Sequence, residues 1–197
     1  DGHDLFIHCI GFSDEDIRKV SRAGASVAWC PASNIFMFNV TCKIRKMLGE
    51  KVNVCIGTDS THTGSVNLLE EMRLARSTYR RLYGEELAAR QLTAMVTANP
   101  ARAFRLQDRT GALAPGLFAD LLVLRPRRED PYEALLEAQI EDIELLLLEG
   151  TPILGAAEHE ELFALRECPC PRVKVRGRPM VVKGDPGGLL GGVRRAV

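Results

Sequence analysis

Short apolar runs alternate with amphipathic segments along the first 60 residues. Residues 5–9, 26–30 and 52–56 are apolar runs of strand length, which is typical of strands buried on both faces. Residues 13–24 and 44–48 predict short helices between them, the first with a capping box at Ser13 and Asp16. Residues 32–39 predict a loop after Pro31. This alternation predicts an α/β fold with parallel strands and right-handed crossovers.

Two longer helical patterns follow, at about residues 65–82 and 85–97. Four residues of the first recur at helical spacing and are expected to face the core: Leu68, Met72, Ala75 and Tyr79. Three charged residues are expected on a solvated or salt-bridged face: Glu70, Glu71 and Arg73. Asn99 and Pro100 predict the N-cap and first turn of another short helix.

The pattern changes to strands and turns near residue 113. Strands are expected at residues 119–124 and 143–148, with a returning strand from 153, and a second hairpin is expected at 173–182. The Gly-rich tail is expected to be loosely ordered. The chain therefore divides into residues 1–112, 113–183 and 184–197.

Composition narrows the classes of partner. The 197 residues carry 26 basic and 26 acidic side chains, so no excess of positive charge favours nucleic acid or an anionic membrane. No apolar run approaches the roughly 18–20 residues of a membrane span. Six scattered cysteines favour a reduced, cytoplasmic protein, and Cys168 and Cys170 are too close for a zinc knuckle. Because a strand begins almost at once, part of the protein is expected to precede this chain.

Two apolar runs end in a polar residue, as strands do at a catalytic or ligand-binding site. The run at 52–56 ends in Gly57-Thr58-Asp59, and the run at 5–9 carries His8 near its end. In parallel α/β folds, ligands and catalytic groups gather at the carboxyl ends of the strands. Each residue alone is more typical of a turn or a satisfied polar group, and the pair makes the functional interpretation stronger.

Five segments, taken in order, resemble the amidohydrolase superfamily, and most closely its cytosine deaminase and chlorohydrolase branch: 8–13, 30–34, 57–59 with 67–75, 97–103 and 111–121. The resemblance implies a (β/α)8 barrel with a small β-sandwich. Residues 1–112 would then hold barrel strands six to eight with their helices, and residues 113–183 part of the sandwich. The family's His-x-His pair and fifth-strand histidine are not in this sequence.

The resemblance also implies a chemistry. Such enzymes hydrolyse C–N bonds other than peptide bonds with water activated by a divalent metal, here zinc or iron, and an aminohydrolase or deaminase of a nitrogen heterocycle is expected. Asp59 matches the carboxylate that binds metal and accepts the water's proton, and His8 matches a catalytic histidine with possible metal contact. Ser33, Asn34 and His62 are candidate substrate-binding residues, with plain loop roles as the alternative.

The sequence also allows other interpretations of its function. With most metal ligands missing, residues 1–197 alone are expected to be inactive and to bind zinc weakly. The alternative is a non-catalytic half-barrel that assembles with itself or a partner, because open strand edges need a cover. The expected partners are a small-molecule substrate and either a second copy of the chain or a missing N-terminal half. No Gly-x-Gly-x-x-Gly pattern supports a nucleotide-binding domain. The apolar residues 36–38 suggest a substrate pocket that favours an apolar group.

Overall fold

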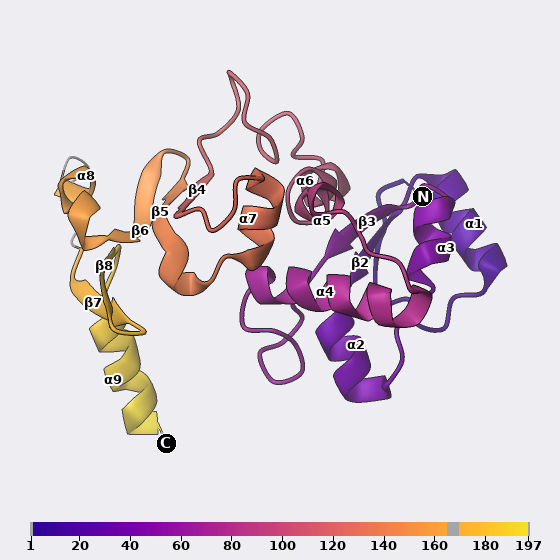
Figure 1. The fold of residues 1–197 in the computed structure, drawn as a ribbon, viewed down its shortest axis with the longest axis horizontal. Coiled ribbons are helices and arrows are strands. Elements are labelled where there is room, and N and C mark those ends of the chain that lie inside the picture. The colour runs from indigo at the N-terminus through magenta and orange to yellow at the C-terminus, as the bar shows by residue number, and fades with distance from the viewer. Residues whose placement is uncertain (1, 165–169, 197) are drawn as a thin grey trace. The chain divides into compact units, whose positions relative to one another are not determined.

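The computed structural model describes residues 2–164 and 170–196 (Figure 1). The chain forms two compact units, one made of Asp1–Leu117 with Arg128–Glu137 and the other of Phe118–Arg127 with Ala138–Val197. The α/β class is confirmed. Cys168 lies outside the described residues, so the role of its pair with Cys170 stays open.

The first unit is built on a three-stranded parallel sheet in the order β1-β2-β3. Its strands are β1 (Leu5–Ile7), β2 (Ser26–Trp29) and β3 (Asn53–Ile56). Its helices are α1 (Asp14–Ala23), α2 (Pro31–Phe38), α3 (Ile44–Gly49), α4 (Leu68–Tyr83), α5 (Ala89–Val96), α6 (Ala98–Ala103) and α7 (Pro131–Glu137). The predicted β-α-β alternation is therefore confirmed.

The central strand of this sheet lies in the core. Val27 and Trp29 of β2 and Val54 of β3 are fully buried, and helical side chains such as Ile17 and Met47 pack in the same cluster. β1 differs, because its residues Phe6 and Ile7 are 38% and 59% exposed. The sheet is thus anchored through β2 and β3, and β1 forms a partly open edge.

The ends of α1 follow the sequence. The Ser13 hydroxyl accepts a hydrogen bond from the Asp16 N–H at 3.2 Å, and the Asp16 carboxylate accepts one from the Ser13 N–H at 3.0 Å. Gly24 has a φ of 68°, a left-handed conformation that ends the helix without the steric cost of a side chain. The predicted capping box and helix end are both confirmed.

Residues 31–38 form helix α2, so the loop predicted at 32–39 is wrong. Pro31 occupies the first helical turn, where the missing N–H costs nothing. Cys30 precedes α2 and Lys43 precedes α3, and neither side chain forms a capping hydrogen bond. A backbone N–H at the start of α2 donates instead to a carboxylate from a distant part of the chain.

Two other helix starts differ from the prediction. α4 begins at Leu68, with the Asn67 side chain accepting the Glu70 N–H at 2.9 Å, rather than near residue 65. Leu68 is 41% exposed, and Leu69 faces the core in its place. Asn99 lies inside α6 rather than capping it, because its amide donates to the Val54 carbonyl at 2.7 Å. The start of α4 follows from this local cap, and the place of Asn99 from a tertiary contact.

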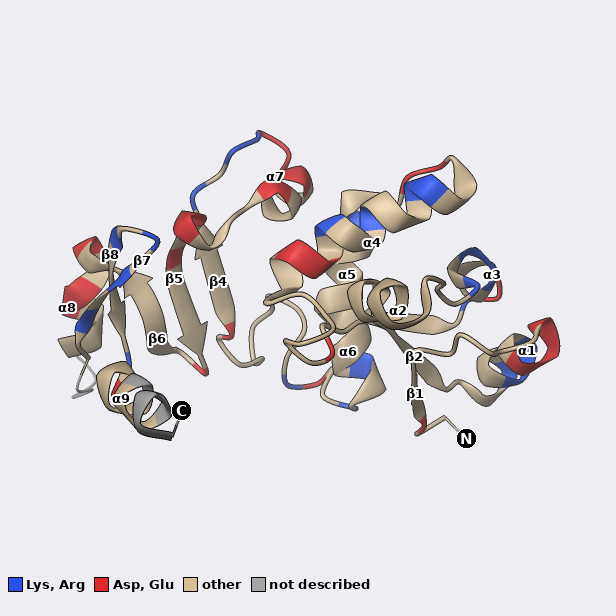
Figure 2. Ribbon diagram, turned by 90° about the horizontal axis from the view of Figure 1, so that it is seen from below, with Lys and Arg blue, Asp and Glu red and all other residues tan. Residues whose placement is uncertain are grey.

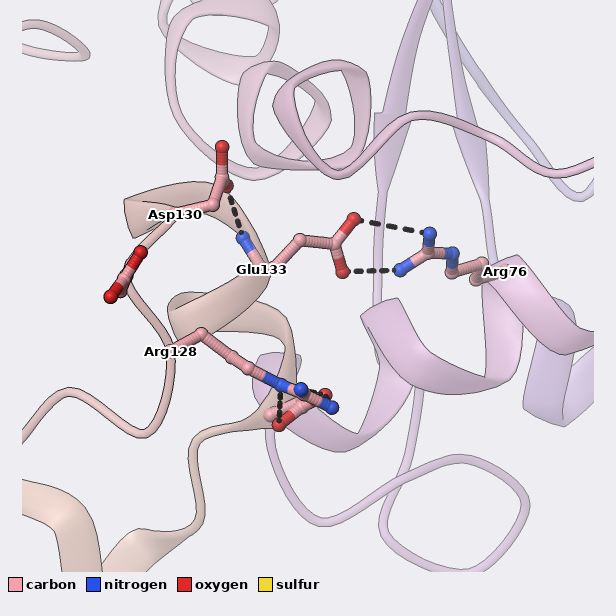
Figure 3. Close-up of a pocket in the computed structure, with 6 residues that line it drawn as sticks. Arg76, Arg128, Asp130 and Glu133 are labelled. Atoms are coloured by element: carbon pink, nitrogen blue, oxygen red, sulfur yellow. Dashed lines mark hydrogen bonds and ion pairs between the residues drawn. The ribbon is translucent and has the colours of Figure 1, made fainter.

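Helix α7 docks on α4 through charged side chains. The Arg76 guanidinium donates to both carboxylate oxygens of Glu133, at 2.7 and 3.1 Å (Figure 3). Figure 2 shows α4 acidic near its start and basic further along, which suits the helix dipole. A hollow of about 520 Å³ beside Arg76 and Glu133 is lined by charged groups, with Arg128 paired to Glu137.

The second unit is a five-stranded antiparallel sheet in the order β4-β5-β6-β8-β7. Its strands are β4 (Leu121–Leu124), β5 (Ile143–Leu148), β6 (Thr151–Ala156), β7 (Arg172–Val175) and β8 (Arg178–Val182). Its helices are α8 (Glu160–Ala164) and α9 (Pro186–Ala196), with short 3-10 turns at Ile140–Asp142 and Ala157–His159. Both predicted hairpins are confirmed.

The Gly-rich tail is helical rather than loosely ordered. Helix α9 begins after Asp185, whose side chain accepts the Gly188 N–H at 2.8 Å and so caps the first turn. The prediction overlooked this cap. Within residues 2–164 and 170–196, no helix is long and apolar enough to cross a membrane.

Candidate active site

His8 and Asp59 approach each other at the carboxyl ends of two parallel strands. His8 follows β1 directly, and Asp59 lies three residues beyond Ile56, the last residue of β3. The distance between His8 Nε2 and Asp59 Oδ2 is 3.8 Å, and each side chain is 30% exposed. The two candidates taken from the strand ends therefore form one partly accessible pair.

Both residues have a backbone conformation that is unusual for residues with side chains. The φ angle is 66° at His8 and 57° at Asp59, in the left-handed region. Histidine and aspartate tolerate this region better than most residues, but it still costs on the order of 1 kcal/mol. Such strain collects at functional sites, where the surrounding structure maintains it. Six other non-glycine residues among those described share the left-handed conformation, so it agrees with a functional site at His8 and Asp59 and does not by itself identify one.

Helix α2 supplies the immediate partners of the pair. The side chains of Ser33 and Asn34 are fully buried. The Ser33 hydroxyl donates a short hydrogen bond to Asp59 Oδ2, and Asn34 Oδ1 lies 2.8 Å from His8 Nδ1. The structure therefore places both residues against His8 and Asp59, and their predicted contact with substrate stays a prediction.

Hydrogen bonds keep the Asp59 carboxylate ionised. The bond from Ser33 lowers the pKa of Asp59 most, and the Ser60 N–H, the nearby His8 and the Thr63 hydroxyl lower it further against partial burial. The Thr63 hydroxyl lies 3.4 Å from Asp59 Oδ2. An ionised carboxylate can bind a cation or accept a proton, which are the two roles expected of Asp59.

The loop after Asp59 is tightly folded. The N–H groups of Thr63 and Gly64 both donate to the Ser60 carbonyl, at 3.1 and 2.7 Å. A Cβ added to Gly64 would lie 1.6 Å from the Thr58 carbonyl oxygen, so this position requires glycine. His62 is exposed at the tip of this loop, and its predicted role in substrate binding stays a prediction.

Glu71 is a site-supporting residue that the sequence interpretation placed wrongly. Its side chain is fully buried rather than solvated. One carboxylate oxygen accepts the Ala32 N–H at 2.9 Å and the other the Ser65 N–H at 3.3 Å. Glu71 therefore satisfies the start of α2 and ties it to the loop after Asp59. The signal that could have revealed it is the 71-75-78 spacing, which places Glu71 on the face of Ala75 and Thr78.

The pair fits part of a metal site. An imidazole nitrogen and a carboxylate oxygen are both ligands that zinc accepts, but they fill only part of a tetrahedral set. Among residues 2–164 and 170–196, no group of three or more His, Cys, Asp or Glu side chains could hold a metal. Burial raises the pKa of the neighbouring Cys30 thiol to about 12, with help from Asp59 and Glu71, so it stays protonated. Further ligands would have to come from elsewhere.

Comparison with known proteins identifies the family. A sequence model described as "Amidohydrolase family" matches residues 4–155. The chain belongs to the amidohydrolase family. The resemblance carried by the five segments is thereby confirmed, and the match includes both His8 and Asp59.

Curated relatives within the amidohydrolase family are named as deaminases. A 5-methylthioadenosine/S-adenosylhomocysteine deaminase of Pyrococcus abyssi is 32% identical over 161 residues, covering 77% of this chain and 37% of the relative. A 5'-deoxyadenosine deaminase of Methanosarcina mazei is 31% identical over 156 residues, covering 74% and 36%. The chain therefore spans less than two fifths of the length of these relatives.

Solved structures support the amidohydrolase fold. An adenosine deaminase from Xanthomonas campestris with bound zinc superimposes with a TM-score of 0.77 at 20% identity, covering 97% of this chain and 41% of that one. An atrazine chlorohydrolase from Arthrobacter aurescens complexed with zinc gives 0.67 at 24% identity, covering 82% and 39%. At these identities the likeness concerns the fold alone.

Proposed function

We propose that this chain is part of a metal-dependent aminohydrolase that removes an amino group from the nitrogen heterocycle of a nucleoside-like substrate. The observation that carries the proposal is the His8–Asp59 pair, 3.8 Å apart at the ends of parallel strands, inside the segment that matches the amidohydrolase family. In this assignment β1, β2 and β3 are barrel strands six, seven and eight. The second unit is then part of the small β-sandwich.

A divalent metal fits the donor types of His8 and Asp59. When bound, zinc would supply the Lewis acidity that makes water nucleophilic near neutral pH. Asp59 then accepts a proton from the attacking water, because hydrogen bonds from Ser33 and Ser60 keep it ionised. His8 orients the reacting groups beside it. The water oxygen bonds to the ring carbon, the carbon–nitrogen bond breaks, and the proton held by Asp59 leaves with ammonia.

The deaminase interpretation is supported more strongly than chloride displacement. Deamination is the activity named for the sequence relatives, at 31–32% identity, whereas the chlorohydrolase likeness concerns the fold. A cytoplasmic location, a small-molecule substrate and assembly with a second copy or an N-terminal segment belong to the same proposal. Which of zinc and iron is used also belongs to it.

Ammonia release tests this proposal. The whole zinc-loaded protein would be assayed with 5-methylthioadenosine, S-adenosylhomocysteine and 5'-deoxyadenosine. We expect ammonia from at least one of these compounds. Asp59→Asn should lower kcat/KM by about 10²–10⁴-fold, because the variant loses its proton acceptor.

Asp108→Asn, at an exposed position outside the site, is the matched control and should retain activity. Failure to release ammonia from all three compounds would overturn the deaminase proposal and favour the non-catalytic alternative. Full activity of the Asp59→Asn protein would overturn the role of Asp59.

A further inference from the structure

A chain of hydrogen bonds runs from the core to the candidate catalytic histidine. The Trp29 indole N–H donates to the Thr41 hydroxyl oxygen at 2.7 Å, and the Asn34 amide nitrogen donates to the same oxygen at 3.1 Å. The Asn34 amide oxygen then lies 2.8 Å from His8 Nδ1. Trp29 and Asn34 are fully buried, which limits the access of water at the inner end of the chain, whereas His8 at the outer end is 30% exposed.

The direction of the chain is set at its buried end. An indole nitrogen can only donate a hydrogen bond, so the Thr41 oxygen must accept from Trp29. The Asn34 amide nitrogen donates to the same Thr41 oxygen at 3.1 Å. The Asn34 amide therefore turns its nitrogen to Thr41 and its oxygen to His8.

This direction decides where the neutral imidazole carries its proton. The Asn34 oxygen can only accept, so His8 Nδ1 must be the protonated nitrogen. The lone pair then lies on Nε2, which is the nitrogen 3.8 Å from Asp59 Oδ2. Two electron-pair donors thus face each other, which suits a cation or a hydrogen-bond donor placed between them.

We propose that Trp29, Thr41 and Asn34 form a positioning relay that holds His8 in the tautomer with Nδ1 protonated and Nε2 facing Asp59. The three side chains act through His8, because their hydrogen bonds lead to its Nδ1. The proposed deaminase function gives the relay its purpose, but the relay itself needs neither metal nor substrate. Partners of this kind, which fix the ring orientation and tautomer, typically affect metal affinity or activity by about 10–100-fold.

Nitrogen NMR of histidine-labelled, metal-free whole protein tests the relay directly. At about pH 9, well above the ordinary histidine pKa, ring nitrogen shifts and long-range proton couplings distinguish the two neutral tautomers. The His8→Gln protein identifies the His8 signals by their loss. We expect Nδ1 to be protonated in the unchanged protein. A protonated Nε2 would overturn the proposal.

Variants of Thr41 separate the relay from simple packing. Thr41→Val removes the hydroxyl at similar volume and should shift His8 toward the Nε2-protonated tautomer, whereas Thr41→Ser should keep the original one. Thr93→Val is the control, because the Thr93 hydroxyl donates within its own helix, to the Ala89 carbonyl at 2.9 Å. An unchanged tautomer in Thr41→Val would overturn the relay.

A second variant covers the case in which Thr41→Val does not fold. Asn34→Asp keeps an acceptor against His8 and should retain the Nδ1-protonated tautomer, and a protonated Nε2 there would contradict the proposal. The outcomes also separate the two proposals. The expected tautomer without ammonia release would overturn the deaminase function alone, and ammonia release with a protonated Nε2 would overturn the relay alone.

Discussion

At the scale of single residues, Glu71 has the most demanding environment. Its carboxylate is fully buried, and two backbone N–H groups, from Ala32 and Ser65, satisfy it. Burial raises the pKa of Glu71 above its ordinary value of 4.5, and these hydrogen bonds oppose the shift. A buried charge is tolerated only when its partners are in place. The two hydrogen bonds of Glu71 therefore form only when α2 and the loop after Asp59 are correctly packed together.

We predict that Glu71→Gln changes how stability depends on pH. The raised pKa means that the folded protein binds this proton more readily than the unfolded chain between pH 4.5 and the folded-state pKa. The free energy of unfolding of the unchanged protein should therefore fall as pH rises through that window. Because glutamine does not titrate, the unchanged protein should lose stability relative to the variant as pH rises.

Urea unfolding at a series of pH values measures this difference. Glu158→Gln, at an exposed position in the other unit, is the matched control and should follow the unchanged protein. A gain in stability of the unchanged protein relative to Glu71→Gln as pH rises would contradict the argument.

The residues of the site differ in how visible they are in the sequence. His8 and Asp59 could be found because apolar runs end at them. Glu71 could not be told from Glu70, because the choice depends on the rotation of α4, and Leu69 rather than Leu68 faces the core. The hydrogen bond from the Trp29 indole could not be predicted either, since a buried tryptophan is expected in the core whether or not its N–H has a partner.

At the scale of elements, α2 shows why a local pattern can fail. Its sequence, Pro-Ala-Ser-Asn, is typical of a turn, and Cys30 provides no side-chain cap. The capping carboxylate comes from Glu71, 39 residues further along the chain. A helix stabilised from such a distance cannot be predicted from its own residues. By contrast, α1 carries its own capping box and could be predicted.

We predict that the ion pair between α4 and α7 contributes little to stability. Arg76→Lys would lose the two parallel hydrogen bonds to Glu133 (Figure 3) and the one that Arg76 Nε donates to Glu86 at 3.0 Å. The side chains are 25% and 37% exposed, so water and salt screen the pair, and the cost should stay below about 1 kcal/mol. Chemical denaturation at low and high salt measures it, with Arg81→Lys as the exposed control on the same helix.

The cost of Arg76→Lys should shrink further at high salt, because added ions screen the attraction. A loss of several kcal/mol, unchanged by salt, would show instead that the docking of α7 depends on the guanidinium fork.

At the scale of the whole chain, the first unit has a partly open sheet. Within the part of the chain that the structure describes, β1 and β3 each pair only with β2. The parallel direction of the strands could be predicted from the β-α-β alternation. Their places as barrel strands six to eight come from the family resemblance and stay a prediction, because numbering strands requires the neighbours on either side.

We predict that residues 1–197 alone bind zinc weakly. The described residues offer the pair His8 and Asp59, and no group of three or more candidate ligands. Metal analysis after dialysis should find much less than one zinc per chain. The whole protein, prepared in the same way, is the matched comparison and should retain more. One tightly held zinc in the 197-residue chain would contradict the partial-site interpretation.

The left-handed backbone at His8 and Asp59 means that thermal stability and catalytic activity favour different residues at these two positions. Glycine adopts this conformation at no steric cost, and asparagine adopts it more readily than most residues. A population selected only for survival at high temperature would therefore drift toward these residues at both positions and lose its proton acceptor on the way. Keeping histidine and aspartate there demands continued selection for the reaction itself.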